Sequence, residues 1–193
     1  KRLRTDYLDV LHIHSLKLGD DLAELEAKGG ALEALFRLRD QKVVRYVGIT
    51  SHHDPATLAK ALERHDFDCT QMAINAGLQG TSPDGAGYWK KDKNDLFGEP
   101  IPHAPSPGSS FQDVGLPVAV RKKLGIVAMK VTGQDSLIGG TATKAPAADL
   151  LRYALSLPVS IATIGMPQLE FIRNNTAWVR TFKPMSKREL QDF

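Results

Sequence analysis

The order of hydrophobic and polar residues along the chain predicts strands that alternate with helices. Five short runs rich in Val, Ile, Leu and Met are too short for helices and are typical of buried strands. These runs are residues 6–14, 43–50, 69–75, 126–131 and 159–164. They are continuously apolar rather than alternating between apolar and polar residues, so we expect both faces of each strand to be buried. The pattern therefore favours a parallel sheet built from strand–helix units.

Apolar residues three and four positions apart predict helices between these strands. We expect Asp54 to cap one helix at its N-terminus, with Pro55 at the first helical position. We interpret the polar residues that precede position 29 as a simple link. The predicted helices are residues 29–41, a segment that begins at Pro55, residues 117–124, a segment that begins at Pro146, and residues 167–181.

The segment from Gly77 to Gly115 interrupts this alternation. It is dense in Gly, Pro, Ser and Asp, and structureless loops of such length inside a domain are usually functional or disordered. It follows the third predicted strand, which places it on the mouth side of the sheet. Tyr88 and Trp89 are candidates to close over a bound substrate. An exposed loop with two incidental aromatic residues explains the same sequence equally well.

Composition narrows the class of protein. The 193 residues are 42% hydrophobic and 24% charged, which is typical of a globular chain rather than a disordered one. The net charge of +3 is too small to indicate a nucleic-acid-binding surface, and no apolar stretch is long enough to span a membrane. The single cysteine excludes a disulfide scaffold and a zinc site built from cysteines.

The cell compartment stays open at this stage. A single cysteine is compatible with a cytoplasmic protein, which we favour, but it does not exclude export. The chain begins with Lys rather than Met, so its first residues do not report on a targeting signal.

Several chemically useful residues follow the predicted strands at their carboxyl ends, where barrels and open parallel sheets hold their active sites. His12 and His14 are two positions apart and share one face of the first strand. Together with His52 and His53 they raise the hypothesis of a metal site. A catalytic metal needs three or more protein ligands, and the later strands end without Asp, Glu or His, so we expect no metal. The alternative is that only His14, at the mouth, takes part in chemistry.

Two further features could bind an anion. Lys130 follows a buried strand and must either reach solvent or pair with an anion, so phosphate binding, a Schiff base and a simple rim position are all open. Residues 165–175, GMPQLEFIRNN, cross from the last strand into a helix, whose first N–H groups can bind phosphate. This run is neither a Walker loop nor a GxGxxG motif, and a plain strand–helix turn would have the same sequence.

Five segments in order resemble the aldo-keto reductase family. KRLRTDYLDVLHIHSL is similar to the family's fourth strand, and VRYVGITSH to its (I/V)RxIGVSN segment. QMAIN resembles the Q-x-x-Y-N strand, LGIVAMKVTGQ the GIxxxAYSPLGxG segment, and ATIGMPQLEFIRNN the closing IPGxxxxxxLxEN segment. The order and spacing agree from Lys1 to about Trp178. The Met-Lys pair at positions 129 and 130 is typical of a bacterial subgroup of the family.

The resemblance implies a (β/α)₈ TIM barrel, of which residues 1–193 form one partial domain with strands four to eight. A complete barrel of this kind needs about 250 residues, with about 200 as a lower limit. The family transfers a hydride between NADPH or NADH and an aldehyde or ketone. The implied partners are therefore NADP(H) or NAD(H) and a small carbonyl compound, with the oligomeric state left open.

The resemblance also assigns roles to individual residues. His14 matches the catalytic histidine, which orients the substrate carbonyl and supports proton donation by a tyrosine. The Asp, Tyr and Lys that complete this catalytic set precede that histidine in the family, and this chain begins after them, so we expect it to be inactive alone. The implied cofactor-binding residues are Thr50, Ser51 and Gln71 at the nicotinamide carboxamide, Met129 at the ring, Lys130 at the pyrophosphate, Gly165 and Met166 at the adenosine phosphate, and Asn174 and Asn175 near the adenine.

Three departures from the family pattern affect these expectations. Ser51 stands where the family has Asn, and Met129 where many members have a stacking aromatic residue. Phe171 occupies a position where many members carry an Arg for the 2′-phosphate, which weakens the case for NADPH over NADH unless Arg173 substitutes.

Two other functions remain as alternatives, because a fold does not determine a function. One is a non-catalytic module on the same fold that senses the cofactor. The other is a metal-dependent barrel hydrolase that uses His12 and His14.

Overall fold

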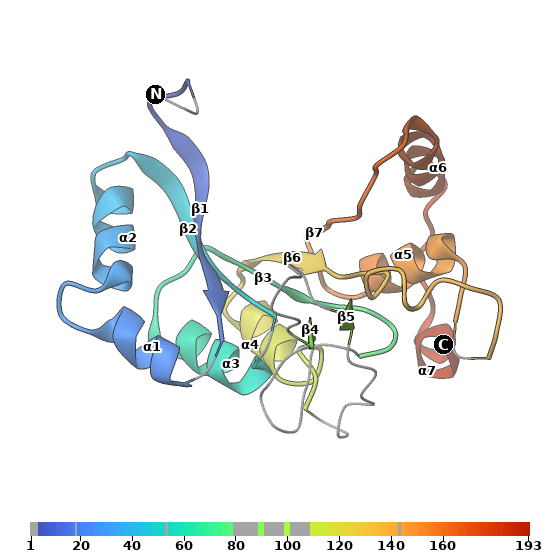
Figure 1. The fold of residues 1–193 in the computed structure, drawn as a ribbon, viewed down its shortest axis with the longest axis horizontal. Coiled ribbons are helices and arrows are strands. Elements are labelled where there is room, and N and C mark those ends of the chain that lie inside the picture. The colour runs from blue at the N-terminus through green and yellow to red at the C-terminus, as the bar shows by residue number, and fades with distance from the viewer. Residues whose placement is uncertain are drawn as a thin grey trace.

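The computed structural model of the chain contains a five-stranded parallel sheet with helices packed along it (Figure 1). The structure describes residues 4–17, 19–52, 54–78, 89–90, 99–100, 109–142 and 144–193. The strands, in their order across the sheet, are β1 (Leu8–Leu16), β2 (Val44–Ser51), β3 (Cys69–Ala73), β6 (Gly125–Met129) and β7 (Ile161–Ala162). Every neighbouring pair is parallel, as the apolar pattern predicts. A separate antiparallel pair joins β4 (Trp89–Lys90) to β5 (Glu99–Pro100).

The helices follow the strands in chain order. They are α1 (Gly19–Glu26), α2 (Ala31–Asp40), α3 (Pro55–Arg64), α4 (Gly115–Arg121), α5 (Ala147–Ser156), α6 (Leu169–Arg180) and α7 (Lys187–Asp192). Helices α1 to α4 lie along β1, β2, β3 and β6, whereas α5 to α7 lie towards the β7 end (Figure 1). None of the helices in the described part of the chain is long and apolar enough to cross a membrane.

Two helices were not expected from the apolar pattern. The residues interpreted as a polar link form α1, because Leu22 is buried in the core and Leu25, three positions on, packs against it. Helix α7 buries no residue, and its start is stabilised by a capping box in which Ser186 and Glu189 bond to each other's backbone N–H groups. Both helices are short, and neither carries enough apolar residues to produce a visible period.

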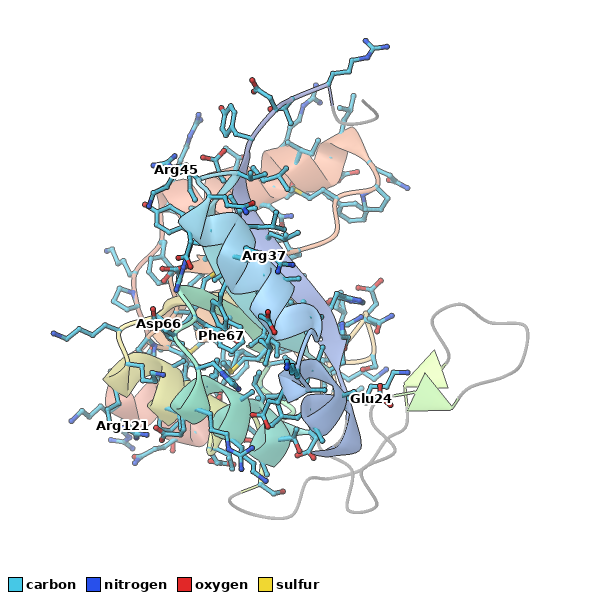
Figure 2. The ribbon with its side chains drawn as sticks, turned by 90° about the vertical axis from the view of Figure 1, so that its left-hand side faces the viewer. Glu24, Arg37, Arg45, Asp66, Phe67 and Arg121 are labelled. Atoms are coloured by element: carbon cyan, nitrogen blue, oxygen red, sulfur yellow. The ribbon has the colours of Figure 1, made fainter. Side chains whose placement is uncertain are left out.

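The hydrophobic core lies between the sheet and the helices. Val47, Ile49 and Met72 point from β2 and β3 towards the helix layer and are 0% exposed. Asp54 caps α3 as predicted, since its carboxylate accepts hydrogen bonds from the N–H groups of Ala56 and Thr57 at 2.9 and 3.0 Å. The outer surface of the helix layer is charged, and Figure 2 shows it with side chains drawn.

The two edge strands leave apolar side chains exposed. Val10 on β1 is 47% exposed, and Ile161 on β7 is 55% exposed. The exposed side chains also include Leu169, at the start of α6. The described sheet is therefore an open arc of parallel strands, which confirms the expectation of an incomplete barrel.

On the face of the sheet opposite the main helix layer, one layer of side-chain positions contains two glycines. His12, Gly48, Cys69 and Gly125 lie level with one another in the strand register. Because Gly48 has no side chain, His12 and Cys69 meet across it, with Nε2 3.1 Å from Sγ. A Cβ at position 48 would lie 2.5 Å from the His12 ring and 2.6 Å from the Cys69 carbonyl oxygen. The backbone oxygen cannot move away without distorting the β2–β3 pairing.

We predict that Gly48→Ala lowers the free energy of unfolding by about 1–3 kcal/mol, the usual cost of overpacking. Gly140→Ala is the matched control, since a Cβ at position 140 would meet nothing within 4 Å. Urea denaturation of both variants measures the difference. Equal stability of the two variants would contradict this account of the layer.

Candidate functional site

A cavity of about 560 Å³ opens at the carboxyl ends of the strands. It is lined by five of the residues assigned a role from the sequence: His14, Gln71, Met129, Lys130 and Gly165. They come from four different strands or the residues that follow them, because the carboxyl ends of parallel strands meet at one side of a sheet. His52, which follows β2, lines the same cavity.

His14 lies at a break in the β1–β2 register. Ile13 pairs with Ile49, but Leu16 pairs with Ser51, so β1 contains one extra residue between these two pairs. Such bulges are common next to active sites because they change the direction of a side chain. The His14 ring lies at the cavity and meets the His52 ring edge to face, with centroids 5.6 Å apart and planes at 76°.

Gln71 and Met129 are neighbours on the cavity wall formed by β3 and β6. The Gln71 side-chain amide contacts the Met129 sulfur, with Nε2 3.4 Å from Sδ. Only 5% of the Met129 surface is exposed. The contact holds the Gln71 amide at the cavity surface beside a polarisable thioether.

The loop that follows β6 forms another wall. Lys130, Gln134 and Asp135 have φ values of +59°, +50° and +70°, which non-glycine residues rarely adopt. The Lys130 ammonium donates to Gln134 Oε1 at 2.7 Å, and Thr132 Oγ1 donates to Asp135 Oδ1 at 3.2 Å. Burial lowers the pKa of Lys130, because half-burial disfavours its charged form.

Of the residues in this loop, only Lys130 was predicted from the sequence to take part in the site. Thr132, Gln134 and Asp135 also line the cavity. The signal available for them was the TGQD turn placed directly after a buried strand.

Thr50 and Ser51 are buried at the end of β2 and are not among the residues that line the cavity. Ser51 Oγ donates to the Leu16 carbonyl oxygen at 2.8 Å, so the hydroxyl supports the end of β1. Thr50 Oγ1 is buried, and no described group hydrogen-bonds it. An unsatisfied buried hydroxyl is costly, so Thr50 is the one of the two that suits a ligand's polar group.

The remaining expected cofactor residues lie along the chain after Gly165. Met166 is exposed, Asn174 is half-buried on α6, and Asn175 is buried on the same helix. None of the three lines the described cavity. Their assignment to the adenosine half of a cofactor stays a prediction.

The proposed metal site gains no support from geometry. The His12 ring contacts Cys69 rather than His14, and the described residues contain no group of three or more His, Cys, Asp or Glu suited to a metal ion. His53 and Tyr88 lie outside the described residues, as does the side chain of Trp89. The expected roles of these three residues remain predictions.

We predict that Cys69 is a slow nucleophile. Burial, helped by the nearby Asp68 carboxylate, raises the pKa of its thiol from 9.0 to about 11. Since the thiolate is the reactive form, a rise from 9 to 11 lowers the thiolate fraction near pH 8 about a hundredfold. Reaction with an aromatic disulfide reagent at pH 8 measures this, with the urea-unfolded chain as control. Equal rates in the two states would refute the prediction.

Comparison with solved structures identifies the fold. The holo form of an aldo-keto reductase from Bacillus halodurans has 16% sequence identity and a TM-score of 0.63. The match covers 99% of this chain and 59% of the reductase chain. An aldo-keto reductase from Klebsiella pneumoniae in complex with NADPH has 18% sequence identity and a TM-score of 0.60. The match covers 98% of this chain and 58% of the reductase chain. The chain spans about 60% of the length of the solved structures it matches.

Sequence comparisons add nothing to this result. No protein-family model matches the chain, and no curated protein is significantly similar to it. The structural likeness therefore establishes the fold, which is that of part of an aldo-keto reductase barrel.

Proposed function

We propose that this chain is part of an oxidoreductase of the aldo-keto reductase type, which transfers a hydride between NADPH or NADH and an aldehyde or ketone. The observation that carries the proposal is the cavity at the strand ends. It brings His14, Gln71, Met129, Lys130 and Gly165 together on a fold shared with a reductase solved with NADPH. The proposal covers the whole protein, of which this chain provides the larger part of the barrel.

The residues on the β3 and β6 wall of the cavity suit a nicotinamide. Its carboxamide has one acceptor and two donors, and the Gln71 amide offers both kinds of group at the cavity wall. The buried Thr50 hydroxyl lacks a described partner and would be satisfied by the same carboxamide. The Met129 sulfur beside Gln71 would contact the ring in place of an aromatic residue. The cofactor supplies the hydride.

The cavity wall formed by Lys130 and Gly165 suits the cofactor's phosphates. Lys130 brings a positive charge to the loop after β6, and Gly165 leaves open space where a side chain would stand. The helix α6 that follows carries Asn174 and Asn175, which we assign to the adenosine half. Phe171 and Arg173 are both exposed on this helix, so either NADPH or NADH is compatible with it.

His14 is the residue that we assign to the substrate. Its imidazole lies at the mouth, where an N–H group can donate to a carbonyl oxygen. Such a hydrogen bond makes the carbonyl carbon more electrophilic and stabilises the alkoxide that forms as hydride arrives. The alkoxide also needs a proton, and the described residues that line the cavity include no tyrosine to donate it.

We predict that the 193-residue chain binds NADPH and that Lys130→Met weakens this binding about tenfold, the usual effect of losing a charge-assisted hydrogen bond. Lys60→Met is the matched control, because Lys60 is exposed on α3 and does not line the cavity. NADPH fluorescence titration gives the dissociation constants. Failure of the unsubstituted chain to bind NADPH or NADH would refute the proposed function.

We also predict that the 193-residue chain by itself does not reduce carbonyl compounds, since the described residues that line the cavity include no tyrosine beside His14. The assay follows NADPH absorbance at 340 nm with methyl benzoylformate as substrate. A longer form of the protein that supplies a tyrosine at the cavity should be active. Steady NADPH oxidation by the 193-residue chain, abolished by His14→Ala, would show that the proton donor lies elsewhere.

A further inference from the structure

His52 lines the cavity, and the proposed function gives it no role. It follows directly after β2, and its ring meets the His14 ring edge to face at 5.6 Å. Both rings line the same cavity, His14 from the adjacent strand β1. A substrate carbonyl held by His14 therefore has a second imidazole close by.

We propose that His52 is a specificity-determining residue that, together with His14, selects carbonyl substrates with a carboxylate next to the carbonyl group, namely 2-oxo acids. This inference rests on the proposed carbonyl reduction. A 2-oxo acid presents a carbonyl oxygen and a carboxylate on adjacent carbon atoms. Two neighbouring imidazoles can donate to both groups at once, one N–H to each.

The hydrogen-bond donors around the cavity suit an anionic substrate. The residues that line it include two imidazoles and Lys130, which can donate, and a single carboxylate, that of Asp135. Asp135 already accepts a hydrogen bond from Thr132 within its own loop. Lys130 lies in the same loop and contacts Gln134 there, on the side that we assign to the cofactor's phosphates. The two imidazoles, which lie at the strand ends of β1 and β2, are thus the groups placed to meet the substrate's own charge.

A matched pair of probes tests this inference. Benzoylformate carries the carboxylate, and methyl benzoylformate has the same ring and carbonyl group without the charge. We expect the 193-residue chain to bind benzoylformate about tenfold more tightly than the ester, as for a hydrogen bond to a charged group. Calorimetric titrations, with and without saturating NADPH, measure both dissociation constants.

Substitution of His52 assigns the effect to its ring nitrogens. We expect His52→Phe to bring the two dissociation constants within about twofold of each other, through weaker binding of benzoylformate alone. We expect His52→Gln to keep part of the preference, because its amide N–H still donates. The phenylalanine variant keeps the aromatic contact with His14 and removes the nitrogens. His65→Gln is the control, because His65 pairs with Glu26 away from the cavity and should keep the tenfold preference.

The outcomes separate this inference from the proposed function. A preference for benzoylformate that the phenylalanine variant retains in full overturns the inference, and so does the absence of any preference in the unsubstituted chain. Weaker binding of both probes to the glutamine variant, with normal binding to the phenylalanine variant, shows that His52 acts through packing alone and also overturns it. The NADPH titration is independent of these results: loss of cofactor binding refutes the reductase, whereas the probe preference decides the role of His52.

Discussion

The burial of β2 and β3 against the helix layer is the interaction on which the rest of the structure depends. Val47, Ile49 and Met72 lose all contact with solvent there, and Leu58 and Leu62 of α3 do so from the other side. Strands β1 and β6 pair in parallel with β2 and β3 on either side of this packed centre. Because all the strands are parallel, their carboxyl ends meet at one side, where the cavity lies.

On the opposite face of the sheet, glycines leave room for larger side chains from neighbouring strands to meet. Glycines at positions 48 and 125 alternate with His12 and Cys69 in one layer, and the two larger side chains meet across the first glycine. Burial lowers the pKa of His12 and raises that of Cys69, so both groups stay neutral near pH 7. This neutral layer precedes the cavity along the strands, and the polar side chains that line the cavity follow at the carboxyl ends.

The backbone departs from regular geometry next to the candidate site. One extra residue in β1 lies beside His14, and left-handed residues begin at Lys130 directly after β6. Bulges and left-handed conformations at non-glycine residues cost free energy, and they occur most often where a side chain must point in a particular direction. Their position at the two strands that carry the proposed substrate and phosphate groups supports the proposed function independently of the resemblance.

The sequence by itself determined the parallel sheet, the cap at Asp54 and the candidate residues at the strand ends. Continuous apolar runs, capping residues and strand boundaries are local properties, so they are visible without a fold. Only the tertiary structure decided that Ser51 supports β1, that His12 meets Cys69, that the loop after Lys130 lines the cavity, and that His52 stands beside His14. Each of these contacts depends on strand register or on a bulge, which joins residues distant in the chain, and no local pattern encodes such a pairing.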